Sequence, residues 1–328
     1  MSYQTAADTL IEASGAAQAR VTFGLRDALL RARNSDGGWA YAAGKRTRLE
    51  PTCWALLALA TVDDQPVNVE RLRTWPQHDG WLLDLAGTPP NQAFNALAAL
   101  TLLQDPSGIQ VARPILVNLL SAKGERYAQS DYSPQDNSLQ AWSWVEGTAS
   151  WVEPTAWSLL LLKKLRGDGL LPPAGFARTQ VGERMLLDRV CSVGGWNYGN
   201  ARVFEHDLWP YVPTTALALL ALQDRRDLPS VTRSLQQMQN DLVTERSAVA
   251  LALALVCLNV YGRPAGPGGD NNTATALSSP IRTVAGDLVG LAARDLETPA
   301  DNVLGQAMAL YALSESSRTP RIFSLLSR

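Results

Sequence analysis

The chain has 328 residues, of which 46% are hydrophobic and only 18% are charged, against about 25% charged in an average globular domain. Its 29 Lys and Arg and 31 Asp and Glu give a net charge of −2 without any basic run, which argues against a nucleic-acid partner. Residues 1–19 lack the layout of a secretory signal, and the longest apolar run, 248–258, is too short to cross a bilayer. We therefore expect a cytoplasmic protein with a large core and no transmembrane segment.

Six segments combine an apolar face with a polar face, which is typical of helices on the surface of a domain. The first places Val21, Leu25 and Leu29 on one face and Arg26 opposite. The other five lie near Val67–Trp75, which is short, and near Val111–Leu120, Val181–Val190, Val231–Leu242 and Ile281–Leu291.

Between these lie six segments that are apolar nearly all the way round, so protein must enclose them on every side. They are Trp54–Ala60, Ala93–Leu103, Ala156–Leu162, Thr214–Leu222, Ser247–Leu258 and Val303–Leu313. Two concentric rings of helices satisfy this alternation, whereas in a simple bundle every helix keeps one face exposed to solvent. The sequence therefore predicts an all-α fold, an (α/α)6 barrel or α-α toroid, as a single domain over residues 1–328. Its inner helices should begin near Glu50, Asn91, Glu153, Val212, Glu245 and Asp301.

The three cysteines, Cys53, Cys191 and Cys257, have neither metal-type nor disulfide-type spacing, and each lies in or beside a helical segment. We interpret them as small core residues. The sequence predicts no metal site and no cofactor.

Short repeats mark the connections from outer to inner helices. The string Gly-Gly-Trp-Ala-Tyr at residues 37–41 recurs as Gly-Gly-Trp-Asn-Tyr at 194–198, with a weaker echo at 79–81. Because repeated residues serve a repeated structural role, we interpret Trp39, Trp81 and Trp196 as turn-packing residues.

Glu50 and Glu153 each precede a proline and a threonine at a predicted helix start. A carboxylate there favours the positive end of the helix, and in that role Glu50→Gln and Glu153→Gln would each cost about 0.3 to 1 kcal/mol. The alternative hypothesis makes both residues catalytic acids at the mouth of the central cavity.

The recurring turn, helix start and apolar inner helix resemble the squalene-cyclase and protein-prenyltransferase repeat superfamily over most of the chain. The resemblance implies an α-α toroid with a terpene cyclase-like or prenyl-transferring activity on an isoprenoid. The zinc ligands of the prenyltransferases have no counterpart, since Leu255 lies two residues before Cys257 and no His follows His206. The Asp-rich acid motif of class II terpene cyclases is reduced to a single Glu at Glu50 and at Glu153.

His206 and Asp207 are not repeated, and they precede the fourth inner helix. A His beside a carboxylate serves as a base or positions an acid, so both are candidate catalytic residues. The alternative is a surface pair of a His and an acid.

The longest connection, residues 124–153, exceeds the roughly 12 to 15 residues of ordinary loops and is rich in aromatics. We expect it to fold over one mouth of the ring, with Tyr132, Trp142, Trp144 and Trp151 as ligand-binding residues. The alternative is that these rings only cover the ends of inner helices. The Gly- and Pro-rich stretch 262–280 is predicted to be a mobile loop.

Three functions remain open. The first is a terpene cyclase- or prenyltransferase-like protein that acts on or binds an isoprenoid or another apolar ligand. The second is a non-catalytic toroid that binds a protein or lipid partner. The third is a carbohydrate-active barrel with two carboxylates across a cleft, for which Asp131, Asp136 and Glu146 are available. The centre of the ring should distinguish them, being deep and apolar, filled with side chains, or polar and open.

Overall fold

The computed structural model describes residues 3–128, 134–263, 271–297, 302–314 and 322–325. Its outer helices are α1 (Tyr3–Arg31), α3 (Glu70–Arg73), α5 (Ile109–Ser121), α7 (Pro173–Asp188), α9 (Pro229–Asp241) and α11 (Asn271–Glu297). Its inner helices are α2 (Leu49–Asp63), α4 (Gln92–Leu102), α6 (Val152–Gly167), α8 (Val212–Ala221), α10 (Ala248–Tyr261) and α12 (Val303–Leu313). The predicted alternation and the toroid are confirmed.

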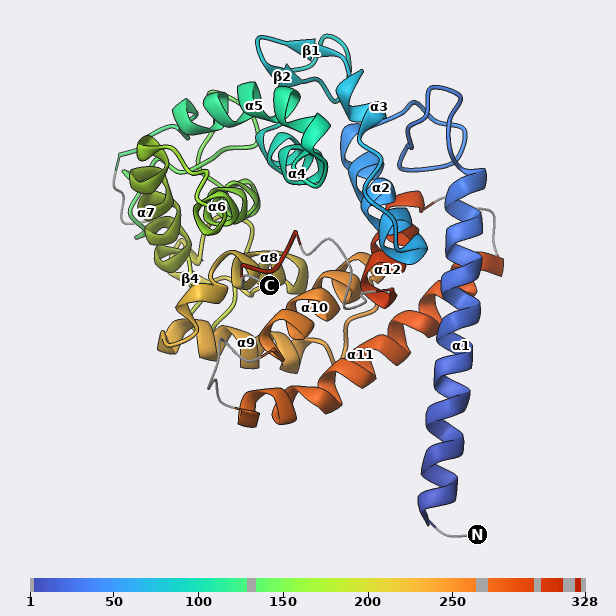
Figure 1. Ribbon diagram of the computed structural model, residues 1–328. Coiled ribbons are helices and arrows are strands. Elements are labelled where there is room, and N and C mark those ends of the chain that lie inside the picture. The colour runs from blue at the N-terminus through green and yellow to red at the C-terminus, as the bar shows by residue number, and fades with distance from the viewer. Residues whose placement is uncertain (1–2, 129–133, 264–270, 298–301, 315–321, 326–328) are drawn as a thin grey trace.

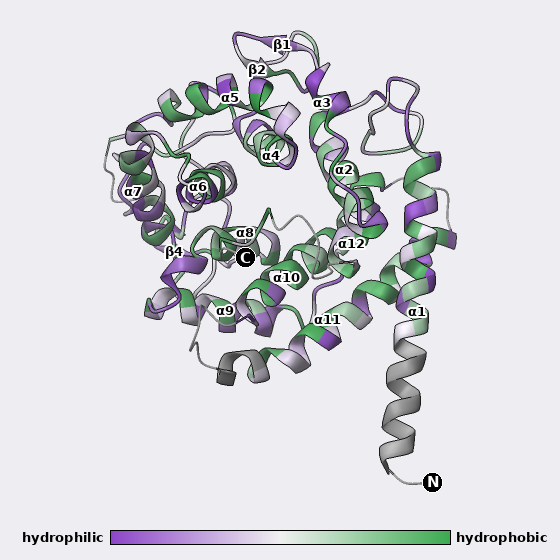
Figure 2. Ribbon diagram, viewed as in Figure 1, coloured by the Kyte–Doolittle hydropathy of each residue, from purple (hydrophilic) through white to green (hydrophobic). Residues whose placement is uncertain are grey.

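The inner helices form a closed ring in which each contacts the next and α12 returns to α2 (Figure 1). Their residues are buried almost throughout, and α10 is coloured mostly hydrophobic in Figure 2. Outer helices pack behind them, and the N-terminal part of α1 projects beyond the ring. None of the helices in the described ranges is long and apolar enough to span a membrane.

Within the described ranges, strands occur in two small hairpins in the connections. Strand β1 (Gln77–His78) pairs with β2 (Trp81–Leu82), and β3 (Arg202–Val203) pairs with β4 (His206–Asp207). Two short 3-10 helices, η1 (Pro106–Gly108) and η2 (Gln223–Arg225), complete the elements.

One part of the expected loop at 262–280 is helical, because α11 begins at Asn271. Leu277 is buried and precedes Ile281 and Val284 on the same helical stripe, so the apolar face of α11 extends one turn further back than expected. Residues 264–270 lie outside the described ranges.

Trp196 connects three elements at the turn between an outer and an inner helix. Its indole donates to the Leu186 carbonyl of α7 at 2.7 Å, and its backbone N–H donates to the Thr215 hydroxyl of α8 at 3.0 Å. Gly195 precedes it at φ +75°, where a side chain would meet Pro210 and Thr215, so the turn requires glycine.

The same pair of bonds recurs at Trp39 and at Trp142. The Trp39 indole donates to the Leu29 carbonyl and its backbone N–H to Thr52, and Trp142 bonds Leu119 and Thr155 in the same way. In the connection before α4, Leu82 rather than Trp81 takes the buried position of the turn tryptophan. Its backbone N–H donates to the side chain of Asn95, which stands where α2, α6 and α8 have a threonine. We call this arrangement the turn clamp.

Backbone bonds also join neighbouring connections at the end of the ring where the inner helices begin. The N–H of Val152 donates to the Tyr198 carbonyl at 2.8 Å, and the N–H of Val303 donates to the Tyr41 carbonyl at 2.9 Å. Gln92 and Trp144 form the equivalent bond. In each case the acceptor lies two residues after a turn-clamp tryptophan, so these aromatic residues are fixed at one mouth of the ring.

The C-terminal segment 322–325 lies in the middle of the ring (Figure 1). The amide of Gln223, just after α8, donates to the Phe323 carbonyl at 2.7 Å and accepts from the Leu325 N–H at 2.9 Å. Lys164, near the end of α6, donates to the Ser324 carbonyl. The segment is therefore held at the end where the inner helices finish, opposite the mouth where they begin.

The turn clamp predicts a specific loss of stability. Replacing Thr215 by Val keeps the side-chain shape but removes the acceptor of a buried N–H, so unfolding should become easier by about 1 to 3 kcal/mol. Urea unfolding followed by circular dichroism measures this. The matched change Thr232→Val, on the exposed face of α9, should shift stability by less than about 0.5 kcal/mol, and equal effects of both would contradict the clamp.

Candidate active site

Glu50 and Glu153 occupy the same position, the second residue of α2 and of α6. The other four inner helices carry Ala93, Pro213, Val249 and Leu304 there. The carboxylates are thus particular to the first and third inner helices and are not a general feature of the inner-helix start.

The two side chains share one mouth of the ring, because all inner helices begin at that end. They are near enough to interact electrostatically, since the charge of Glu50 raises the pKa of Glu153. We call this end the carboxylate mouth.

Glu50 accepts a hydrogen bond of 2.7 Å from the Tyr41 hydroxyl. Burial raises its pKa to about 6. The hydrogen bond from Tyr41 and the charge of Arg48 lower this pKa, whereas the charge of Asp84 raises it. Arg48 itself is paired with Asp84. Glu50 is therefore a carboxylate that ionises at mildly acidic to neutral pH.

Burial raises the pKa of Glu153 further, to about 8, and the charge of Glu50 contributes, while a hydrogen bond with Trp157 works in the opposite direction. Glu153 is therefore protonated at neutral pH. Both glutamates nevertheless keep some contact with solvent, so neither lies in a sealed core.

The start of α2 is capped by a different acid. Asp84 accepts from the Leu49 N–H at 2.9 Å while it holds Arg48. A carboxylate placed to stabilise a helix end benefits from its charge, whereas the surroundings of Glu50 and Glu153 disfavour the charge. At the start of α2, therefore, Asp84 rather than Glu50 stabilises the helix end.

An aromatic cluster lies one turn along the same helices. Trp54 and Trp157 pack edge to face with ring centroids 6.1 Å apart, and Tyr311 of α12 joins them. Phe323 stacks on Trp54 at 5.5 Å and contacts the other two rings. The C-terminal segment thus places the Phe323 ring among aromatic side chains of α2, α6 and α12 inside the ring, one turn along from the glutamates.

The aromatic residues predicted to bind ligand have different surroundings. Trp142 is 0% exposed and serves the turn clamp, so the expectation that it lines the mouth is wrong. Trp144 is half-buried and packs edge to face on Phe94. Trp151 is the half-buried residue before α6, and Tyr132 lies outside the described residues.

His206 and Asp207 form the exposed strand β4, just before α8 as expected. Asp207 is paired with Arg202 at 3.7 Å across the hairpin. The structure therefore places both residues on the surface, with the acid paired to an arginine, and among the described residues no contact joins either of them to the glutamates.

The acids named for a carbohydrate cleft are also separate from this site. Asp131 lies outside the described residues, and Asp136 bonds Ser138 within its own turn. Glu146 lines a hollow of about 520 Å³ together with Trp81 and Glu125.

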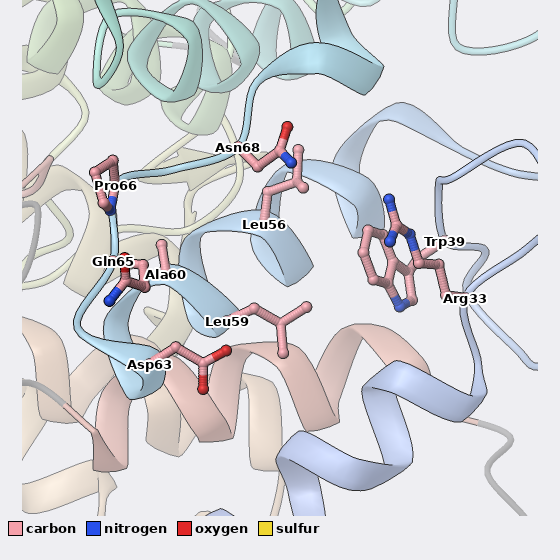
Figure 3. A pocket seen from close by; sticks show the side chains of 9 residues that line it. All are labelled: Arg33, Trp39, Leu56, Leu59, Ala60, Asp63, Gln65, Pro66 and Asn68. Atoms are coloured by element: carbon pink, nitrogen blue, oxygen red, sulfur yellow. The ribbon is translucent and has the colours of Figure 1, made fainter.

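A smaller hollow of about 170 Å³ lies between α1 and α2, lined by Trp39, Asp63 and others (Figure 3), and does not include either glutamate. In the described part of the chain no three His, Cys, Asp or Glu side chains are grouped to hold a metal ion.

Sequence reasoning missed Tyr41, Asp84 and Phe323. The signal for Tyr41 was present, because the residue two places after a repeated turn tryptophan is aromatic at both Tyr41 and Tyr198. Nothing in the local sequence marks Asp84 or Phe323, whose roles depend on contacts with distant elements.

The sequence matches no protein-family model and no curated protein. Several solved structures share the fold. A GH76 alpha-mannanase of Bacteroides thetaiotaomicron is similar with a TM-score of 0.61 and 10% identity, over 93% of this chain and 96% of that one. Rex8A of Paenibacillus barcinonensis, in complex with xylose, gives 0.53 and 13% identity over 96% and 97%.

The type II terpene cyclase MstE of Scytonema gives a TM-score of 0.54 and 15% identity, over 91% of this chain and 97% of that one. These likenesses establish the α-α toroid fold. They do not single out the squalene-cyclase and prenyltransferase superfamily, because mannanases match with higher TM-scores, 0.61 and 0.58.

Because the pKa of Glu153 is raised, removing its carboxyl group should make the folded protein more stable at alkaline pH. Because the pKa of the folded state, about 8, lies above the ordinary 4.5, ionisation opposes folding; this penalty is absent below about pH 4.5 and grows until pH 8. Glu153→Gln should therefore melt at a higher temperature than the wild type at pH 8 and at a similar one at pH 4.5.

Thermal unfolding at both pH values tests this, with the exposed Glu146→Gln as the control. A loss of stability in Glu153→Gln at pH 8 would instead support the helix-start role considered from the sequence.

Proposed function

We propose that the protein is a glycoside hydrolase in which Glu153 is the general acid and Glu50 is the base or nucleophile. The observation that carries this proposal is a pair of carboxylates at one mouth whose surroundings separate their pKa values, about 8 and about 6. Hydrolysis of a glycosidic bond needs one protonated and one ionised carboxyl group at the same pH.

The chemistry follows from the two protonation states. Glu153 gives its proton to the glycosidic oxygen as the bond to the sugar carbon breaks, and the departing sugar leaves as an alcohol. Glu50 either removes a proton from the water that attacks this carbon or attacks it directly, after which water releases the sugar. The Tyr41 hydroxyl holds the Glu50 carboxylate in place through its 2.7 Å bond.

The similar structures support a carbohydrate substrate. They include the GH76 alpha-mannanase, an α-1,6-mannanase of Salegentibacter in complex with α-1,6-mannotriose, and Rex8A with xylose. The Phe323 ring takes up space inside the toroid, which favours a substrate that binds across the mouth over one that is enclosed in the ring. An oligosaccharide fits this requirement.

The test is an assay of the purified protein on tetrasaccharides of mannose, xylose and glucose, with product analysis by chromatography. We expect cleavage of at least one of them, and a loss of about 10²- to 10⁴-fold in Glu50→Gln and in Glu153→Gln. Glu146→Gln, which changes a carboxylate outside the pair, should retain activity. Cleavage that survives both substitutions would overturn the assignment.

The pH dependence gives a second test. The kcat/KM should rise as Glu50 loses its proton near pH 6 and fall as Glu153 loses its proton near pH 8, giving a bell-shaped profile. In Glu50→Gln the residual activity should lack the acidic limb. A profile that only falls from pH 4 upward would contradict the assignment.

The second candidate is the terpene cyclase-like activity on an isoprenoid. The aromatic cluster of Trp54, Trp157 and Tyr311 favours it, because aromatic faces stabilise cations, and MstE shares the fold. It ranks second because an acid with a pKa of about 8 is a poor proton donor to an alkene and because Phe323 occupies the cluster.

The same assay therefore includes a linear polyprene and a prenyl diphosphate with Mg²⁺. Conversion of either one without cleavage of any sugar would replace the first proposal by the second. If no substrate in the panel is converted, the proposed catalytic function fails and a binding toroid for a protein or lipid partner is favoured.

A further inference from the structure

Three exposed aromatic residues flank the start of α8. Tyr198, Trp209 and Tyr211 are 47%, 61% and 46% exposed, although rings of this size are normally covered in a folded domain. We call these three residues the aromatic platform. Exposed apolar area costs about 25 cal/mol per Å² relative to burial, so a group of exposed rings marks a surface for a ligand.

The platform is rigidly held. The Asn197 amide donates to the Trp209 carbonyl at 2.6 Å, and the Trp209 indole bonds Asp241 at the end of α9. Tyr198 and Tyr211 pack on each other with ring centroids 5.0 Å apart and planes inclined by 36°. Rings that are fixed before binding lose little entropy when a ligand arrives.

The other repeats provide an internal comparison. Tyr41 and Trp144 occupy the position of Tyr198 in their own connections, two residues after a turn-clamp tryptophan. Tyr41 is bonded to Glu50, and Trp144 packs against Phe94, so both are partly covered. Only in the connection before α8, among these three, is the ring half exposed.

Contacts of Tyr198 and Gly199 join the platform to the start of α6 at the carboxylate mouth. The Tyr198 carbonyl accepts from the N–H of Val152, the residue immediately before Glu153. Trp151, on the other side of Val152, lies against Gly199, where an added Cβ would be 2.7 Å from the indole. A ligand that reaches Glu153 from this side of the ring would therefore pass the platform.

We propose that the aromatic platform is a sugar-binding subsite that holds an oligosaccharide next to Glu153. A pyranose ring has a face of C–H groups that packs on an aromatic ring and a rim of hydroxyls that bonds polar neighbours, here the Asn197 amide and the tyrosine hydroxyls. This inference rests on the proposed glycoside hydrolase and adds to it a second sugar-binding position beyond the bond that is cleaved.

The experiment measures binding separately from cleavage. Binding of the mannose, xylose and glucose tetrasaccharides is measured by calorimetry in Glu153→Gln, in which turnover should be slowed about 10²- to 10⁴-fold. Adding Trp209→Ala or Tyr198→Ala should weaken binding at least tenfold, whereas Trp209→Phe should keep most of it. Phe176→Ala, which removes an exposed ring on the outer helix α7, is the matched control and should have no effect.

Kinetics of the single variants complete the test. Trp209→Ala in the otherwise unchanged enzyme should raise KM for a tetrasaccharide at least tenfold and leave kcat within about twofold, with a smaller effect on a disaccharide. Circular dichroism confirms that each variant is folded.

The outcomes separate the two proposals. If the tetrasaccharide binds through Trp209 but no variant with both glutamates cleaves it, the platform stands and the hydrolase falls. If cleavage occurs and neither Trp209→Ala nor Tyr198→Ala changes KM or binding, the platform falls and the hydrolase stands. If no sugar binds and none is cleaved, both fall.

Discussion

The enclosure of six inner helices is the constraint on which the rest of this structure depends. A helix such as α10, buried on all sides, has no room for charge along its length. Charged groups of the inner ring are therefore concentrated at helix ends, as with Glu50 and Glu153 at one end and Lys164 at the other. The turn clamp keeps those ends in register, because each tryptophan bonds both the preceding outer helix and the following inner one.

The chemical properties of the glutamates follow from the same constraint. At the start of a buried helix a carboxyl group loses much of its hydration, and desolvation is the largest cause of the raised pKa of each. The Tyr41 bond partly offsets this for Glu50, and the Glu50 charge adds to it for Glu153, so two residues in equivalent positions acquire different protonation states. The same repeat position thus carries one carboxyl group with a pKa of about 6 and one with a pKa of about 8.

The C-terminal segment changes what the toroid can accommodate. Its Phe323 ring packs against Trp54, Trp157 and Tyr311, and its backbone is bonded to Gln223 and Lys164. This aromatic ring takes up space inside the toroid, which agrees with the proposed binding of the ligand at the rim. The exposed rings of the platform, joined to the start of α6 through the Tyr198 carbonyl, lie on this rim.

Features that depend on periodicity were predictable from the sequence. The inner helices begin within three residues of the expected positions, for example α10 at Ala248 against Glu245, because an apolar segment without a polar face has few alternatives. Trp142 was misassigned because Gln-Ala replaces Gly-Gly before it, which hid the repeat. The site itself depends on residues that meet only in the folded ring, such as Glu50 and Glu153, so its electrostatics could not be read from local patterns.

The central claim is that the fold gives Glu50 and Glu153 separate, raised pKa values, and a direct measurement of those values tests it. Carbon-13 NMR of labelled glutamate carboxyls, with Glu50→Gln and Glu153→Gln used to assign the signals, follows each titration. We expect Glu153 to titrate near pH 8 and Glu50 near pH 6, and the Glu153 value to fall in Glu50→Gln. Titration of both residues near the ordinary 4.5 would contradict the account.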